Sequence, residues 1–203
     1  MIFIPGLFRF LKRVIENDMT GSPVSDEPDE LNTVADIARY LWAKGEQLRP
    51  AGMNDIRRVE ASYNHKLPFA YLEFLKYMGR GTSRFMVGSS VFMDELLELY
   101  DWAQELCLEN DIPSIPDNAF VFWMHQGYQA LYFLPDEGDD PAIYYYHEGS
   151  GAKRFEKQKL SFIDFLKTEL LLHYPEVMNK IKDEEVLKRL HENKEMNKQG
   201  HHF

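Results

Sequence analysis

The sequence has very little cysteine and no long apolar run. Its 203 residues include a single cysteine, Cys107, which excludes an internal disulfide framework and fits a reducing compartment. No stretch approaches the roughly 20 apolar residues that a helix needs to cross a bilayer. The opening residues MIFIPGLFRFLKRVIEN carry their basic side chains after the apolar ones, without a small-residue cleavage site, which is atypical of a signal peptide. We therefore expect a soluble cytoplasmic protein.

Lysine and arginine are absent from residue 85 to residue 152, a stretch that contains thirteen acidic residues. The rest of the chain holds all 23 basic residues against 20 acidic ones. A strongly negative potential repels phosphate backbones and attracts cationic partners. We therefore expect no direct nucleic-acid binding and favour a basic protein as the partner. The alternative is that the acidity only maintains solubility.

Motifs for metal or nucleophilic chemistry are also missing. The turn DEGDD, residues 136–140, places its acids side by side, whereas a calcium loop alternates its ligands and ends in a glutamate. The seven histidines form no H-x-x-x-H pair, and one cysteine cannot build a zinc ribbon. Ser89 and Ser90 lie outside any G-x-S-x-G elbow, and no phosphate loop is present. We predict a non-enzymatic protein without metal or cofactor; a hydrolase with an unrecognised carboxylate pair is the alternative.

Three segments follow from the pattern of apolar and polar residues. Residues 1–53 are expected to hold N-terminal helices and a linker, 54–175 an α+β domain, and 176–203 a charged helical tail. Apolar residues at helical spacing predict a helix over 2–16 that docks on its own domain. The alternative is a helix lying at a membrane interface, without stable insertion. A second helix is predicted over 32–48.

Helices are also predicted at both ends of the central segment. One runs from Asn54, as N-cap, to Tyr63, and the next has Pro68 in its first turn and stops at Gly79 or Gly81. The segment SFIDFLKTELLLHYP predicts a closing helix that is capped by Ser161 and stopped by a proline. The segment FMVGSSVFM is typical of one or two short strands.

The segment DELLELYDWAQELCLEN predicts a strongly amphipathic helix with Cys107 on its apolar side. An acidic stripe follows its other side at spacings of three and four residues. Like charges at these spacings repel by a few tenths of a kcal/mol per pair, so their retention suggests a use. The stripe consists of Glu98, Asp101, Glu105 and Glu109.

Three aromatic and β-branched runs, AFVFWMHQ, ALYFLP and AIYYYHE, predict an antiparallel meander. In the third run Tyr144 and Tyr146 share one face, while Ile143, Tyr145 and His147 share the other. The predicted fold class is α+β, with an antiparallel or mixed central β-sheet flanked by helices.

These features suggest a surface that binds another protein. Acidic residues would steer a basic partner, and tyrosines would supply contact area at low entropic cost. The alternative is that the tyrosines are ordinary sheet packing. The predicted partner-binding residues are Glu98, Asp101 and Glu105 on the helix, Asp136, Glu137, Asp139 and Asp140 on the turn, and Tyr128, Tyr144 and Tyr146 on the strands.

Two motifs resemble those of the SUKH superfamily, which groups bacterial immunity proteins with a yeast cell-wall synthesis regulator. The segment IRRVEASYNHKLPFAYLEFLKYMGRG is similar to the family's helix, Leu-Pro-x-x-Tyr-x-x-Phe-Leu and glycine stop. The segment FVFWMHQGYQALYFLPDEGDDPAIYYYHEG resembles its three aromatic strands, and SFIDFLKTEL its closing helix. The resemblance covers residues 54–172, although NH replaces a glycine before Leu-Pro and GRG replaces a glycine pair. The first motif is carried by Leu67, Pro68, Tyr71, Phe74, Leu75, Gly79 and Gly81.

The resemblance implies a SUKH-like α+β domain that binds and neutralises a cognate protein toxin, often a nuclease. This implication agrees with the charge distribution, because nucleases are often cationic where they grip phosphate. The leading hypothesis is an immunity protein that occludes a basic toxin. A regulatory scaffold of the cell-wall regulator type is the alternative, and the oligomeric state is left open.

Overall fold

The aromatic runs between residues 119 and 147 form the centre of an antiparallel sheet. The computed structural model describes residues 27–181 together with 187 and 188, so the predicted helix over 2–16 and most of the tail lie outside the described part. Within that part the strands pair in the order β1-β2-β3-β4-β5, each antiparallel to the next. The strands are β1 Ser89–Ser90, β2 Phe120–His125, β3 Gln129–Phe133, β4 Ala142–His147 and β5 Glu156–Ser161.

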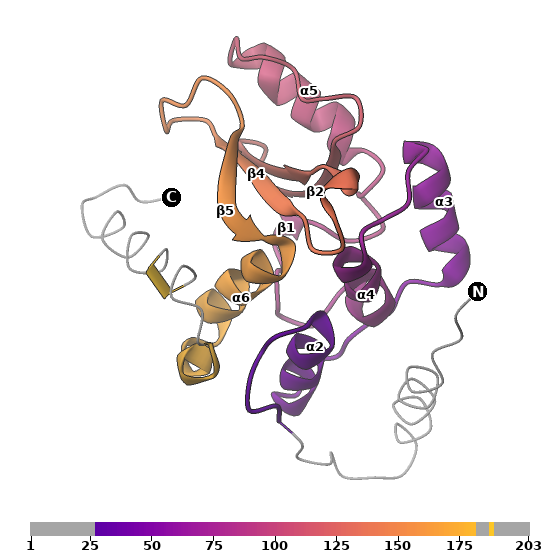
Figure 1. The fold of residues 1–203 in the computed structure, drawn as a ribbon, viewed down its shortest axis with the longest axis vertical. Helices are drawn as coiled ribbons and strands as arrows, with labels where there is room; N and C mark the ends of the chain where they lie inside the picture. Colours follow the sequence, from indigo (N-terminus) through magenta and orange to yellow (C-terminus); the bar gives the residue numbers. More distant parts are fainter. Residues whose placement is uncertain (1–26, 182–186, 189–203) are drawn as a thin grey trace.

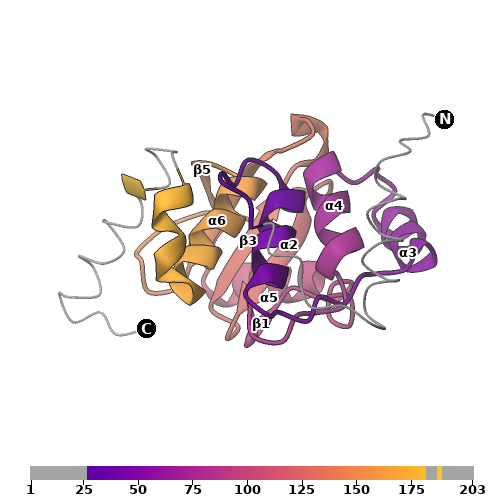
Figure 2. The ribbon, with the colours of Figure 1, turned by 90° about the horizontal axis from the view of Figure 1, so that it is seen from below.

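Helices cover both faces of this sheet. Figures 1 and 2 show α2, α4 and α6 on one face and α5 on the other. The predicted fold class is confirmed, with the sheet antiparallel. The helices are α2 Val34–Ala43, α3 Met53–Tyr63, α4 Phe69–Met78, α5 Leu99–Glu109 and α6 Phe162–His173, with short 3₁₀ turns η1 Pro135–Glu137 and η2 Pro175–Lys180.

An aromatic cluster fills the space between the sheet and the α4–α6 layer. Tyr71 of α4 is completely buried, and its ring centroid lies 5.0 Å from that of Phe120, 5.3 Å from Phe133 and 5.2 Å from Phe162. On the opposite face α5 buries its apolar side, including Cys107, against the sheet. Aromatic side chains bury large areas, so these contacts fix how α4 and α6 sit on the strands.

Residues before the family-like segment share the same core. Thr33 caps α2, and Val34, Ile37 and Leu41 of this helix are fully buried in the common hydrophobic cluster. The division of the chain at residue 53 stays a prediction, although α2 packs against α4 and α6 across it. Among the described residues, no helix combines the length and apolar character that a membrane crossing requires.

Several predicted boundaries are corrected by the structure. Helix α3 is capped at Gly52 rather than at Asn54, because the Asp55 carboxylate accepts a hydrogen bond from the Gly52 backbone N–H at 3.2 Å. Helix α5 begins at Leu99, after a series of turns over residues 93–98. Strand β1 has only two residues, and β5 was not predicted.

Candidate interaction surface

The acidic stripe of α5 faces away from the core. Its four members are exposed and form no ion pair or side-chain hydrogen bond with the described residues. Two leucines flank them, with Leu97 37% exposed and Leu108 82% exposed. The helix therefore presents unpaired carboxylates framed by apolar side chains. These acids are Glu98, Asp101, Glu105 and Glu109.

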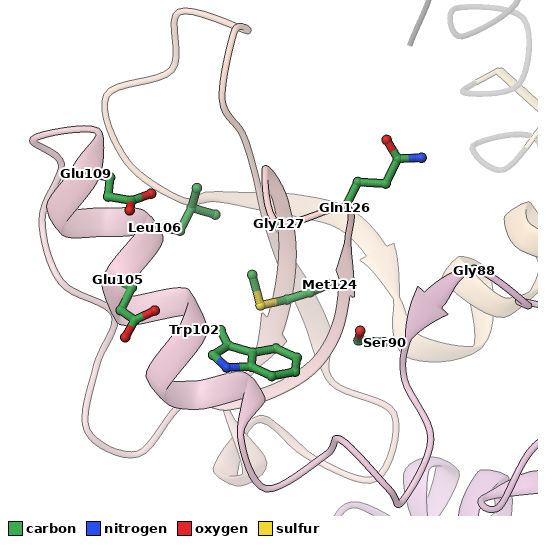
Figure 3. A pocket seen from close by; sticks show the side chains of 9 residues that line it. All are labelled: Gly88, Ser90, Trp102, Glu105, Leu106, Glu109, Met124, Gln126 and Gly127. Atoms are coloured by element: carbon green, nitrogen blue, oxygen red, sulfur yellow. The ribbon is translucent and has the colours of Figure 1, made fainter.

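A groove of about 450 Å³ opens between α5 and the edge of the sheet. Figure 3 shows the indole of Trp102 and the side chain of Met124 pointing toward each other across it, with Glu105 and Glu109 on the helix side. Its lining comes from three segments: Trp102, Glu105, Leu106 and Glu109 of α5, Met124, Gln126 and Gly127 of β2 and its turn, and Gly88 and Ser90 beside β1.

The groove exists because the sheet stops early on this side. Ser90 pairs with Met124 in the antiparallel register, so both side chains project toward α5. Strand β1 contributes only two residues, and no further strand of the described chain pairs beyond it. The corner between α5 and β2 is therefore left uncovered.

The acids of the β3–β4 turn, in contrast, have partners within the chain. The Glu137 carboxylate lies 2.8 Å from Lys157 Nζ and accepts a hydrogen bond from the Tyr144 hydroxyl at 3.0 Å. The Asp140 carboxylate accepts a hydrogen bond from the Ile163 backbone N–H at 3.0 Å, in the first turn of α6. These contacts fasten the turn to β5 and α6.

A backbone hydrogen bond at Asp139 also holds the turn against the rest of the fold. The Asp139 backbone carbonyl accepts a hydrogen bond from Ala70 N–H, at 2.9 Å, which secures the turn to the start of α4. Asp136 is exposed. Desolvation raises the pKa of the Asp140 carboxyl, although hydrogen bonds from Ser161 and Ile163 oppose the shift. The turn thus has a clear role in holding the fold together.

The two acidic regions do not converge on one point. The β3–β4 turn follows the end of β3 where Phe133 pairs with Ile143, whereas the groove lies at the end where Gln129 pairs with His147. Five residues of β3 separate these ends, a length of roughly 15 Å at about 3.3 Å per residue. The structure therefore brings Glu105 to the groove but leaves the turn at the other end of the sheet.

The three candidate tyrosines are all engaged within the chain. Tyr146 is only 3% exposed and packs on Phe155, so the prediction that it contacts a partner is corrected: it lies on the face of the sheet that α5 and the β4–β5 loop cover. The Tyr144 ring stacks on Tyr132 at 4.7 Å. Tyr128, in the turn that borders the groove, donates a hydrogen bond to Gln126 at 3.0 Å and is half-buried.

Sequence reasoning missed two features of this region. Trp102 and Glu109 line the groove together with Glu105, and their spacing of three and four residues along α5 could have signalled a shared face. The second is a hydrogen bond of 3.0 Å between Ser89 Oγ and His125 Nδ1. No carboxylate of the described residues is bonded to that histidine, so the third member of a nucleophilic triad is missing. No set of three or more metal-ligating side chains occurs in the described part of the chain.

These observations define an α+β domain whose most distinctive surface is an acidic helix beside an open groove. The family model SUKH_6, described as SMI1-KNR4 cell-wall, matches residues 53–166, from α3 into α6. The chain therefore belongs to the SMI1-KNR4 family within the SUKH superfamily. Domains of this family are generally non-catalytic, and the family suggests a role in protein interaction. No curated protein matches the chain.

Proposed function

We propose that the protein is a non-enzymatic immunity protein that binds a cognate basic toxin in the cytoplasm and neutralises it by occlusion. The observation that carries this proposal is the set of four exposed α5 carboxylates without partners in the described chain. They stand beside a groove that the sheet leaves uncovered. We assign the toxin-binding surface to α5 and this groove, and not to the β3–β4 turn.

The composition of the surface supports a protein partner. Carboxylates at i, i+3 and i+4 positions repel each other. Nothing in the described fold offsets this repulsion among the four acids, because none of them has an ion-pair or hydrogen-bond partner there. A positively charged surface docked on α5 would remove that repulsion. The exposed Leu97 and Leu108 would add apolar contact at the two ends of the acidic stripe.

The charge distribution suits a cationic toxin, with a nuclease as the expected class. An enzyme that grips phosphate is positively charged at its active surface, which is the surface that an occluding inhibitor must cover. Complementary potentials also accelerate association, up to about 10⁸–10⁹ M⁻¹s⁻¹ at low salt. Fast capture matters for a protein that must intercept a toxin before the toxin acts.

Co-expression with the toxin tests this assignment. The chain would be expressed in a bacterial host with the candidate toxin domain encoded by the adjacent gene, and growth and the dissociation constant would be measured. We expect the triple variant Glu98→Lys, Asp101→Lys, Glu105→Lys to abolish rescue and to weaken binding by at least about 100-fold, because several kcal/mol of like-charge repulsion replace attraction.

The matched control carries the same change of charge at exposed acids elsewhere. Its substitutions are Asp117→Lys, Asp136→Lys and Asp139→Lys, and we expect it to keep rescue and to change the dissociation constant by less than about three-fold, through long-range steering alone. Loss of rescue by the control with retention by the α5 variant would contradict the assignment. Absence of binding by the wild-type chain would contradict the proposed function itself.

The printed description of the family, which refers to the cell wall, supports a second candidate function: a regulatory scaffold for host proteins. In that case the α5 surface would bind a resident protein rather than a toxin. Expression of the chain would then give no protection from the adjacent toxin, while deletion of its gene would alter cell-wall synthesis without any toxin present.

A further inference from the structure

We propose that the groove beside α5 binds an arginine side chain of the basic partner. The inference rests on the proposed function, because it takes α5 as the partner-binding surface. It adds the chemical identity of the anchor residue and its place. The groove volume of about 450 Å³ is within the usual range of roughly 300–1,000 Å³ for ligand pockets.

The first argument is the charge at the helix side of the groove. Glu105 and Glu109 are one helical turn apart, so their Cβ atoms are about 5–6 Å from each other. Both line the opening (Figure 3), and neither has an ion-pair or hydrogen-bond partner among the described residues. One cation seated between them would neutralise two carboxylates at once.

The second argument is the apolar character of the interior. Trp102 is half-buried, while Leu106 and Met124 are 2% and 3% exposed, so their side chains form a floor beneath the two carboxylates. An indole attracts a cation that lies over its face, within about 6 Å of the ring centroid. The methylene stem of a long basic side chain would lie along Leu106 and Met124 while its charged end reaches the glutamates.

Arginine fits this arrangement better than lysine. Its planar guanidinium can stack on an indole and donate hydrogen bonds to two carboxylates, whereas a lysine ammonium is a compact, strongly hydrated point charge. An anionic ligand is disfavoured because none of the described residues that line the groove is basic. The two arginines that come shortly before the groove residues in sequence are not its occupants, because Arg84 pairs with Glu46 and Arg80 pairs with Asp55.

Fluorine NMR on the full chain tests the site directly. The chain has three tryptophans, so uniform incorporation of 5-fluorotryptophan gives three signals, and loss of one in Trp102→Phe assigns the groove signal. The probes are the acetylated, amidated pentapeptides Gly-Ser-Xaa-Ser-Gly with arginine, lysine or citrulline at the third position. Titration at low salt extends to about 10 mM peptide, the range in which contacts worth a few kcal/mol are detected.

We expect the arginine peptide to shift only the Trp102 signal, in a saturable manner. The lysine peptide should bind at least about three-fold more weakly, and the uncharged citrulline peptide should cause no shift. The double variant Glu105→Gln, Glu109→Gln should weaken arginine binding by about ten-fold, since two exposed ion pairs are lost. The matched control Asp136→Asn, Asp139→Asn, with the same change of charge, should leave it unchanged.

The outcomes separate this inference from the proposed function. No Trp102 shift up to the highest concentration, equal shifts of all three signals, or equal binding of the citrulline peptide would overturn the arginine site. If toxin rescue still depends on α5 in that case, the proposed surface stands without the anchor. If the Trp102 signal responds as expected but the chain gives no rescue, the arginine site stands and the toxin function fails.

Discussion

Two acidic regions of this molecule look alike in the sequence and differ in the structure. Helix α5 with its N-cap Glu98, like the β3–β4 turn, carries four carboxylates within a short segment that contains no lysine or arginine. In the turn, Glu137 and Asp140 are bonded to β5 and to α6, whereas the α5 acids have no partner in the described chain. Charge density alone therefore does not identify a binding surface; what separates the two regions is which acids the fold already uses.

The difference follows from what surrounds each region. The turn meets the N-terminus of α6, where the helix dipole and free backbone N–H groups favour negative charge. Lys157 reaches it from β5, which is rich in lysine. The acids of α5 have neither kind of partner: they form no ion pair with the described residues, and β2, the strand on which α5 packs, comes from the same stretch without lysine or arginine. The predictions below compare acids with and without partners, in order of decreasing effect on stability.

The largest effect is expected at Glu46, a buried acid whose carboxylate accepts several hydrogen bonds. Its side chain is completely buried and accepts hydrogen bonds from Ser83, from Arg84 at 2.9 Å and from the Tyr174 hydroxyl. Burial by itself raises the pKa of Glu46, but the hydrogen bonds from Ser83, Tyr174 and Arg84 outweigh it and lower the pKa to about 2. We expect Glu46→Gln to reduce the free energy of unfolding by about 2–4 kcal/mol, because a buried charged acceptor of several hydrogen bonds becomes neutral, while the 62% exposed Arg84 side chain stays hydrated.

Urea unfolding at several pH values measures this prediction. The folded pKa of Glu46 lies below its usual 4.5, so its contribution is present above pH 4.5 and is lost as the pH falls toward about 2. The variant should lack this loss. Tyr174→Phe, which removes one donor, should cost about 1.5–3 kcal/mol. A cost below about 1 kcal/mol for Glu46→Gln would show that the surrounding donors do not depend on the carboxylate.

The next effect is expected at Asp140, whose carboxylate caps the first turn of α6. Asp140→Ala should cost about 1 kcal/mol, as for other helix N-terminal caps, whereas Asp140→Asn keeps an oxygen acceptor for Ile163 and should cost less. Thermal unfolding followed by circular dichroism measures both. Equal costs for the two variants would show that the charge, and not the hydrogen bond, stabilises α6.

The pH dependence at Asp140 has the opposite sign to that at Glu46. Desolvation raises the pKa of Asp140 above its usual 3.8, so its contribution is fully present below about pH 3.8 and is lost as the pH rises through the folded pKa. Asp140→Asn should remove this loss. Its stability relative to wild type should therefore improve from pH 3 to pH 7, in contrast to that of Glu46→Gln.

The sequence predicts those parts of the fold that local pattern and chemistry decide. Helix α6 begins after Ser161 because that side chain accepts a hydrogen bond from the Asp164 backbone N–H, and the helix stops before Pro175 as predicted. The three aromatic strands are confirmed within one or two residues at each end. In each case the element can be predicted from its own apolar periodicity and from the residues at its ends, all of which lie close together in the sequence.

Features that depend on distant partners could not be predicted. Strand β5 has the sequence EKQKLS and buries only Leu160, because it is an edge strand whose pairing comes from β4 rather than from an apolar pattern. The Glu46 network joins residues up to 128 positions apart. The groove follows from the two-residue length of β1, which no local pattern indicates. Which of the acids have partners within the fold also depends on residues distant in sequence, and for that reason it could not be predicted either.

A smaller effect is expected for the Glu137–Lys157 pair, which tests the turn directly. The Lys157 side chain is 51% exposed, so the pair should contribute only about 0.2–1 kcal/mol. A double-mutant cycle with Glu137→Gln and Lys157→Met, measured by urea unfolding, isolates this coupling. The coupling should fall when salt is raised to about 0.5 M, because exposed charges are screened. A coupling of zero at low salt would show that the Glu137–Lys157 contact does not stabilise the turn.

The smallest effect, and the only one with the opposite sign, is expected for α5. Neutralising the stripe with Glu98→Gln, Asp101→Asn, Glu105→Gln and Glu109→Gln should leave the free energy of unfolding unchanged or raise it by a few tenths of a kcal/mol per relieved pair. Added salt should stabilise the wild type slightly and the variant less, because only the wild type has repulsion to screen. Destabilisation by more than about 1 kcal/mol would mean that the α5 acids support the fold, as those of the turn do. The contrast between the two regions would then disappear, and with it the reason for assigning partner binding to α5.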